Sequence, residues 1–256
     1  RLLSVEDSRR GETRYSYTPT GQLERAEYPD GRGQWRKSDQ TGNLYPDPDM
    51  RLRRYLGGGR LEQDGEWHCE YDADGNLTER YLGTGRWLDG KKDRWRYRWN
   101  ADGSLAKVVR PDKREVEFTY DALGRRLSKS FGTTVTRWVW NGNVPLHQWK
   151  QHREYSVVED RWNTDTERRD MTVWLFDEES FVPVAMIKEG RSYSILTDQL
   201  GTPTEAYDTE GNEVWSRVLD MDGNVIEETG NKGMVPFLFQ GQYYDRETGL
   251  AYNRFR

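Results

Sequence analysis

The sequence of 256 residues has few aliphatic side chains and only one cysteine. Leucine, isoleucine, valine and phenylalanine together make up roughly a fifth of the chain, a level close to that of disordered proteins. Mean hydropathy is correspondingly low, at -1.07. Because Cys69 has no second cysteine to pair with, an internal disulfide is excluded. A folded structure must therefore depend on packing and hydrogen bonds.

Long apolar runs and a strong net charge are also missing. No run approaches the ~20 residues that a membrane-spanning helix needs, so we predict no membrane span. The net charge is only -5 although 32% of the residues are charged, and mixed charges of this kind argue against disorder. A pI near 5.5 gives no general attraction to nucleic acid, and we expect no nucleic-acid partner. Since the sequence begins with Arg1 and not with methionine, we expect a fragment of a longer protein.

Aromatic residues are abundant, with 11 tryptophans and 15 tyrosines. Each such ring can bury about 150–250 Å², and a chain rich in Trp, Tyr, Thr and Arg suits half-exposed sheet surfaces. In the segment 94–99, alternation puts Trp95, Tyr97 and Trp99 on one face and the arginines on the other. No long stretch has the apolar spacing of a helix. These features predict an all-β fold.

One short phrase recurs along the chain: an aromatic residue, Asp or another polar residue, two variable residues, Gly, and then an apolar residue after a polar one. Its copies are Tyr17–Leu23, Ser38–Leu44, Tyr71–Leu77, Trp99–Leu105, Tyr120–Leu127, Tyr207–Asn212, Leu219–Val225 and, with one extra residue, Tyr244–Leu250. Each copy predicts a hairpin turn in which glycine takes a positive φ and the neighbouring polar side chain caps the turn. The predicted structural turn positions are Gly21, Gly42, Gly75, Gly103, Gly124, Gly211, Gly223 and Gly249.

The uneven spacing of the copies favours hairpins of variable length over a regular solenoid. A sheet that keeps adding hairpins must curl, close or be covered, because its edges otherwise aggregate. We therefore predict antiparallel hairpins that form a curled spiral sheet or an open part of a large β-barrel.

The recurring Tyr-Asp-x-x-Gly phrase resembles the YD repeat of Rhs proteins, teneurins and the C components of insecticidal toxin complexes. The second half resembles the Rhs-repeat-associated core in the segments Trp138–Asn143, Phe181–Pro183, Asp198–Pro203, Val214–Trp215 and Phe239–Arg256. We expect a YD-repeat β-sheet over residues 1–135. Residues 136–256 are then the Rhs-repeat-associated core, the C-terminal part of the same shell, truncated at its end.

This resemblance implies a hollow β shell that holds a variable C-terminal toxin domain of the same polypeptide. It further implies a secreted or cell-surface bacterial protein, with secretion-apparatus or chaperone proteins as additional partners. The aspartyl autoproteolysis machinery of such proteins lies in an Asp-Pro-x-Gly stretch that has no counterpart in this sequence. We therefore expect no catalytic residue, no enzyme activity, no cofactor and no metal site.

Groups that resemble catalytic or metal sites have simpler interpretations. Asp72–Asn76 and Asp220–Asn224 look like calcium loops, but neither has the frame of an EF-hand, and turn chemistry is preferred. The histidines His68, His147 and His152 lack metal-site spacing. His68 and Cys69 are adjacent on a predicted strand, so their side chains point to opposite faces and cannot pair.

Two alternative functions stay open at this point. A carbohydrate-binding or adhesive surface with a glycan partner would use exposed Trp and Tyr rings. A hydrolase would lie in the segment Gln151–Asp170, which fits the repeat poorly and could equally be an insertion loop. Pairs of carboxylates are expected by chance among 44 acidic residues, so their presence in the sequence does not favour the hydrolase.

Overall fold

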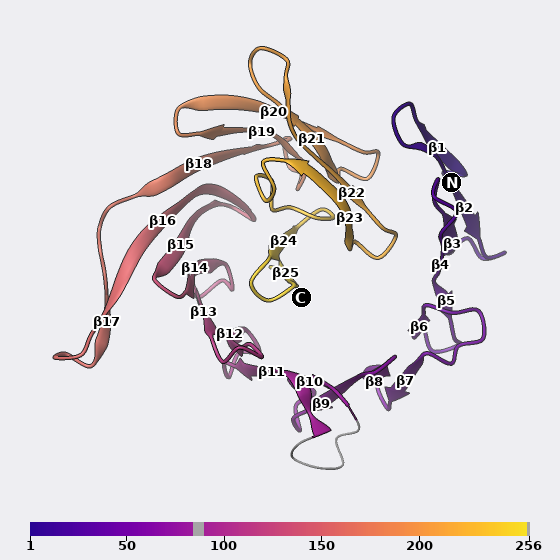
Figure 1. Ribbon diagram of the computed structural model, residues 1–256, viewed down its shortest axis with the longest axis horizontal. Helices are drawn as coiled ribbons and strands as arrows, with labels where there is room; N and C mark the ends of the chain where they lie inside the picture. The colour runs from indigo at the N-terminus through magenta and orange to yellow at the C-terminus, as the bar shows by residue number, and fades with distance from the viewer. Residues whose placement is uncertain (84–89, 255–256) are drawn as a thin grey trace. The chain divides into compact units, whose positions relative to one another are not determined.

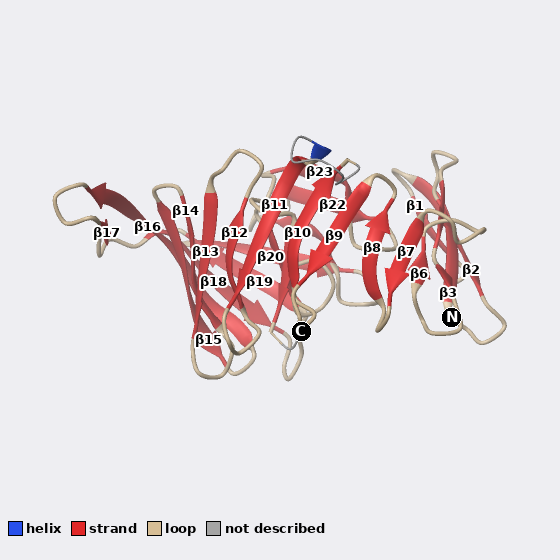
Figure 2. Cartoon of the chain, turned by 90° about the horizontal axis from the view of Figure 1, so that it is seen from below, coloured by secondary structure: helices blue, strands red, loops and turns tan. Residues whose placement is uncertain are grey.

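The computed structural model describes residues 1–83 and 90–254, and these residues form β-strands joined by turns (Figure 2). The described part contains no α-helix, and its one helical feature is a short turn at Gly90. None of it forms a helix with the length and hydrophobicity of a membrane span. The predicted all-β fold of serial antiparallel hairpins is confirmed. The last two residues of the predicted core block, Phe255 and Arg256, lie outside the described residues.

Packing divides the chain into two compact units, Arg1–Arg96 and Tyr97–Arg256. The first unit holds a sheet in the order β1-β2-β3-β4, the pair β5-β6, and the antiparallel run from β7 to β11. Its strands are β1 (Ser4–Asp7), β2 (Gly11–Tyr17), β3 (Leu23–Glu27), β4 (Gly33–Trp35), β5 (Lys37–Ser38), β6 (Leu44–Tyr45), β7 (Arg53–Leu56), β8 (Arg60–Asp64), β9 (Trp67–Tyr71), β10 (Leu77–Leu82) and β11 (Lys92–Trp99), which runs across the division.

The second unit is one long antiparallel sheet followed by a separate hairpin. The sheet strands are β12 (Leu105–Val109), β13 (Glu115–Tyr120), β14 (Arg126–Phe131), β15 (Thr134–Asn141), β16 (Val144–Ser156), β17 (Arg161–Thr164), β18 (Arg169–Phe176), β19 (Pro183–Lys188), β20 (Arg191–Thr197), β21 (Pro203–Tyr207), β22 (Glu213–Leu219) and β23 (Val225–Gly230). Successive strands pair, except that β16 pairs with both β17 and β18. The hairpin consists of β24 (Gln242–Asp245) and β25 (Leu250–Asn253).

The sheet of the second unit curves, and the hairpin β24–β25 lies on its concave side (Figure 1). Strand alternation turns every second residue of the central strands to this side. The buried sheet residues there are Trp138, Trp174, Met186, Ile195, Ala206 and Trp215, and they share one core cluster with Met234, Val235, Phe237 and Tyr243 of the C-terminal segment. The hydrophobic core of this unit is therefore formed between the sheet and the chain's own C-terminal segment.

Seven of the eight copies of the recurring phrase fold into one kind of turn. In the copy at Tyr71–Leu77, the N–H of Asp72 donates to the carbonyl of Asn76 at 3.0 Å, and the N–H of Gly75 donates to the carbonyl of Asp72 at 3.1 Å. The Asp72 carboxylate accepts from the N–H of Asn76 at 2.8 Å. Hydrogen bonds from Asn76 lower the pKa of Asp72, so the carboxylate is held in its charged form within the turn.

Candidate functional site

The last copy of the repeat has a different turn from the others. Its extra residue moves the closing hydrogen bonds, so that the N–H groups of Thr248 and Gly249 both donate to the Asp245 carbonyl, at 3.0 and 2.8 Å. In the copy at Tyr71–Leu77 the aspartate side chain caps its own turn, whereas the Asp245 carboxylate points to strand β14. The insertion thus makes one aspartate of the repeat available for a contact with the sheet.

Asp245 lies in a buried charge network that joins the hairpin to β14. Its carboxylate accepts from a guanidinium N–H of Arg126 at 2.5 Å and from the Lys129 ammonium at 3.0 Å. Lys129 also reaches Glu247 at 2.6 Å. The side chains of Arg126 and Asp245 are only 2% and 3% exposed. Charges buried to this degree are stable only when paired, so the hairpin and the sheet depend on each other.

Aromatic rings enclose the Arg126 guanidinium. Its central carbon lies 4.6 Å from the ring centre of Trp138, 5.0 Å from Tyr243 and 4.4 Å from Tyr252. Phe118 lies farther away, at 5.5 Å. Cation–π attraction is strongest for such desolvated cations. Two of these rings come from the sheet and two from the hairpin, so the cation is held from both sides.

Hydrogen bonds from tyrosine hydroxyls fix the hairpin further. The Tyr252 hydroxyl donates to the carbonyl of Gly124 at 2.9 Å and accepts from the N–H of Arg126 at 3.1 Å. The Tyr243 hydroxyl donates to the side-chain carbonyl of Gln148 at 2.9 Å, which also accepts from Trp138. Burial raises the pKa of Tyr243, which therefore stays neutral and acts as a donor.

A second anchor holds the segment that precedes the hairpin. Arg217 on β22 is buried, and its guanidinium donates to the carbonyls of Val235, at 3.1 Å, and Phe237. Desolvation lowers the pKa of Arg217 to about 10, so it is charged at neutral pH. Glu228 accepts from the Trp215 indole and from the N–H of Gly233, both at 2.8 Å. Backbone as well as side chains of the C-terminal segment are thus bound to the sheet.

This arrangement is suited to holding a segment in place. The network supplies hydrogen bonds and charge pairing between two parts of the chain. Arg126 and Asp245 at its centre are buried, and aromatic rings surround the Arg126 guanidinium. The described residues contain no group of three or more His, Cys, Asp or Glu side chains placed to hold a metal ion. The best-defined site of this chain is therefore an internal docking site on the inner face of the sheet.

The predicted turn glycines all have positive φ. The angles are Gly21 91°, Gly42 88°, Gly75 85°, Gly103 79°, Gly124 75°, Gly211 84°, Gly223 88° and Gly249 69°. At Gly103 an added Cβ would meet nothing within 4 Å, whereas at Gly223 it would lie 2.9 Å from the Phe239 ring. An alanine would therefore be strained at Gly103 by its backbone alone, and at Gly223 by contact as well.

The histidines and Cys69 are placed in separate environments. The His68 ring stacks on Tyr81 at 5.6 Å, while Cys69 is buried and pairs across the strands with Arg80. Burial raises the pKa of the Cys69 thiol, which makes it a poor nucleophile. His147 lies on the outer face of β16 and His152 beside Glu154 at 3.4 Å. The structure does not bring these groups together.

The segment Gln151–Asp170, where a hydrolase was an alternative, forms the far end of β16 and the strand β17. Glu154, Glu159 and Asp160 lie on this exposed hairpin, where Glu159 pairs with Arg161 and Asp160 accepts from the Tyr155 hydroxyl. Three tryptophans of the second unit, Trp138, Trp174 and Trp215, are used for packing, since they are buried in the core. The glycan-binding alternative stays a prediction and would have to use other rings.

Arg126 and Asp245 are not a pair that the repeat pattern predicts. The pattern puts Leu127 at the apolar position of the fourth copy, but in the structure Tyr120 pairs with Arg126, as Tyr71 pairs with Leu77. Leu127 is 38% exposed. Two features of the sequence could have pointed to this site: an arginine at a position where most other copies have an apolar residue, and the extra residue after Asp245.

Comparison with known proteins agrees with the fold and the repeat. The family model described as teneurin YD-shell matches residues 1–254. The chain is similar to the double-stranded DNA deaminase toxin A of Burkholderia cenocepacia (strain H111), with 31% identity over all of this chain and 19% of that protein. It is also similar to the probable deoxyribonuclease RhsB of Dickeya dadantii (strain 3937), with 25% identity over 77% of this chain and 13% of that protein.

Among solved structures, the Photorhabdus luminescens Tc holotoxin pore aligns with 96% of this chain and 11% of its own, at 15% identity and a TM-score of 0.49. The chain spans a fifth or less of the length of these relatives. The family model, in contrast, covers nearly the whole chain. The chain therefore belongs to the teneurin YD-shell family, as the Rhs and YD-repeat motifs in its sequence predicted.

Proposed function

We propose that this chain is a non-catalytic segment of a YD-repeat shell that encloses or presents a C-terminal toxin domain of the same polypeptide. The observation that carries the proposal is the docking of residues 234–253 on the inner face of the second unit. A sheet that binds its own C-terminal segment on the concave side can direct the polypeptide toward an enclosed space.

The inner face of the sheet can hold the C-terminal segment in a fixed position. It is apolar at its centre, where Trp174 packs on Phe237 with ring centres 4.8 Å apart. The charged anchors at Arg126 and Arg217 fix the position of the segment, because each would be left unpaired if the segment moved away. Apolar packing supplies the binding free energy between the sheet and the C-terminal segment. The buried charges determine which residues of the segment face which strands.

The names of the relatives agree with a toxin partner. The Burkholderia protein is named as a DNA deaminase toxin and the Dickeya protein as a deoxyribonuclease, and this chain corresponds to a minor part of each. We assign such activities to other parts of these proteins, and we assign a geometric role to this chain. A secreted or cell-surface bacterial location follows from the same proposal.

Limited proteolysis of the full-length protein that contains this chain tests the proposal. We expect its C-terminal domain to survive a protease concentration that degrades the same domain expressed alone. A variant with Asp245→Asn should expose the domain to the protease, since the anchor of the hairpin is weakened. Release or digestion of the domain in the unmodified protein at the rate of the isolated domain would overturn the proposal.

A further inference from the structure

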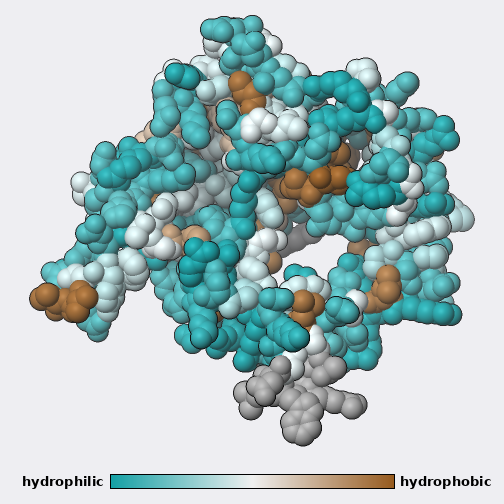
Figure 3. All heavy atoms as spheres, in the orientation of Figure 1, coloured by the Kyte–Doolittle hydropathy of each residue, from teal (hydrophilic) through white to brown (hydrophobic). Residues whose placement is uncertain are grey.

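The far end of β16 forms a hairpin with β17 that extends past the neighbouring strand. β15 begins at Thr134, which pairs with His152, whereas the β16–β17 pairing continues to Ser156 and Arg161. At the end of this hairpin, Val157 and Val158 are 85% and 96% exposed. Figure 3 shows hydrophobic atoms at this end of the molecule. Two adjacent valines so exposed are unusual at the surface of a soluble domain.

Aromatic side chains continue the apolar surface from the tip toward the base of the hairpin. Tyr155 and Trp162 face each other across the strands, with ring centres 5.5 Å apart, and are 47% and 44% exposed. Alternation along β16 puts Trp149 on the same face as Tyr155. We call this surface, with Trp149, Tyr155, Val157, Val158 and Trp162, the hairpin stripe.

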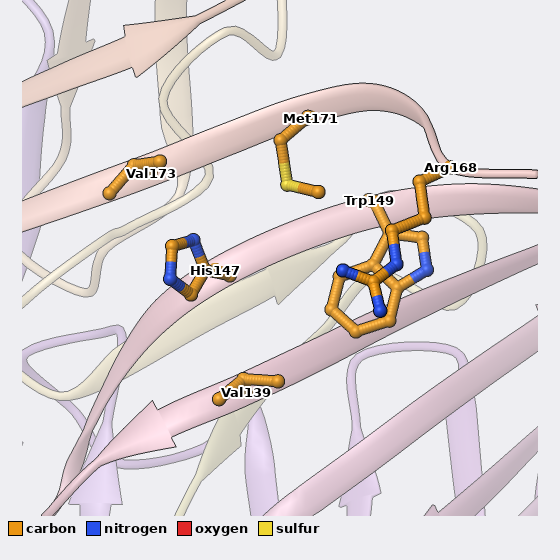
Figure 4. Close-up of a pocket in the computed structure, with 6 residues that line it drawn as sticks. All are labelled: Val139, His147, Trp149, Arg168, Met171 and Val173. Carbon is orange, nitrogen blue, oxygen red and sulfur yellow. The ribbon is translucent and has the colours of Figure 1, made fainter.

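At the base of the hairpin the stripe ends in a pocket of about 230 Å³ (Figure 4). The residues that line it are Val139, His147, Trp149, Arg168, Met171 and Val173. Val139, His147 and Val173 lie side by side in the pairing of β15, β16 and β18, on the face opposite to the buried Trp138. The pocket is thus apolar at its floor and opens to the outer face of the sheet.

The tip and the pocket have opposite charge. Glu159 and Asp160 follow the two valines at the tip and outnumber Arg161, which pairs with Glu159 at 3.2 Å, so the tip keeps a net negative charge. Arg168 lies at the pocket with its guanidinium 4.9 Å above the Trp149 ring, and within residues 1–83 and 90–254 no carboxylate pairs with it. An apolar tip with acidic neighbours is complementary to an apolar pocket with a free cation at its edge.

We infer that the hairpin stripe is a dimerisation surface, on which a second copy of this chain inserts Val157 and Val158 into the pocket lined by Val139, Met171 and Val173. Trp149 on β16 and Val157 directly after β16 are eight residues apart, which corresponds to about 26 Å in an extended strand. A two-fold axis near Arg153 would bring each tip to the pocket of the other copy at the same time. The contact is then made twice, as in most symmetric dimers.

Sedimentation equilibrium of the chain from micromolar to millimolar concentration tests this inference. We expect a monomer–dimer equilibrium, and we expect Val157→Ser with Val158→Ser to raise the dimer Kd by at least about a hundredfold, from the loss of two buried apolar side chains at each contact. Val139→Lys should weaken the dimer as well. These side chains are exposed in one copy, so the far-ultraviolet circular dichroism should not change.

A matched control removes two exposed apolar side chains elsewhere in the same unit. Leu123 and Leu200 are 64% and 58% exposed, and Leu123→Ser with Leu200→Ser should leave the dimer Kd unchanged. Charge reversal gives a second readout: Arg168→Glu should weaken the dimer, and Glu159→Lys in the same chain should restore it. A protein that stays monomeric at millimolar concentration, or a dimer that the valine substitutions do not weaken, would overturn the inference.

Discussion

Replacement of Asp245 by asparagine removes the charge at the centre of the network between the hairpin and β14. Asparagine has the same shape, so the packing around the site is kept while the negative charge is lost. Lys129 retains Glu247, whose carboxylate is 2.6 Å away. Arg126 retains no carboxylate, and its side chain is only 2% exposed. The free energy of unfolding therefore reports the cost of one buried cation without its counter-ion.

The magnitude follows from two opposing effects. Loss of one partner of a buried ion pair costs about 3–5 kcal/mol. The rings around Arg126 reduce this cost, because cation–π attraction to a desolvated cation is worth up to about 2 kcal/mol and does not depend on Asp245. We therefore expect Asp245→Asn to lower the free energy of unfolding by about 3 kcal/mol.

Urea unfolding, followed by tryptophan fluorescence and by circular dichroism, measures this change. Trp138 lies 4.6 Å from the Arg126 guanidinium carbon and reports on the site directly. As a control, Asp170→Asn removes the carboxylate of the exposed pair with Lys150 and should cost at most about 1 kcal/mol. Arg126→Met should lower the free energy of unfolding less in the Asp245→Asn variant than in the unmodified chain, because in that variant it removes a buried cation that has lost its carboxylate. A cost of Asp245→Asn below about 1 kcal/mol, or strictly additive costs, would refute this account of the network.

Three further predictions concern the turns and the hairpin. Gly103→Ala should lower the free energy of unfolding in urea by about 1–2 kcal/mol, because Gly103 has a positive φ of 79°. Gly57 lies outside the left-handed region, so Gly57→Ala should not destabilise the chain. Equal effects of the two substitutions would contradict the turn assignment. Tyr252→Phe should cost about 1–2 kcal/mol in the same assay, because the carbonyl of Gly124 loses its donor; an unchanged midpoint would show that this bond is unimportant. The hydrogen bond from the Thr41 hydroxyl helps to lower the pKa of Asp39 to about 2, so the charged Asp39 contributes fully to stability above about pH 4, and this contribution is lost as the pH falls toward 2. The difference in melting temperature between the unmodified chain and Asp39→Asn should therefore narrow over that range. A constant difference would contradict this role of Asp39.

The sequence was sufficient to predict the strands and turns because the information for them is local. Alternation of rings and charges, and a glycine at a fixed place in each phrase, are set by neighbours within a few residues. Residues Asp198–Thr202 form the same turn, with the N–H of Asp198 donating to the Thr202 carbonyl at 2.9 Å, although they do not match the recurring phrase. The residue before them is Thr197 and not an aromatic residue. The same turn forms with Thr18 or Asn100 in place of the aspartate, so the backbone turn needs the glycine and a polar residue before it more than the ring.

The docking site was not predictable in the same way, because its partners are far apart in sequence. Arg126 and Asp245 are separated by 119 positions, and nothing in either segment alone indicates the other. Each residue does depart from the local pattern, Arg126 by replacing an apolar residue and Asp245 by the insertion that follows it. Departures of this kind from a local pattern are expected at functional or strained sites.

A structure of the full-length protein at side-chain resolution, by electron cryomicroscopy, tests the central claim most directly. We predict that residues 243–252 lie on the concave side of the curved sheet with Asp245 bound to Arg126, and that the C-terminal domain lies within the space that the shell encloses. A C-terminal domain on a tether outside the shell, with Asp245 separated from Arg126, would contradict the account.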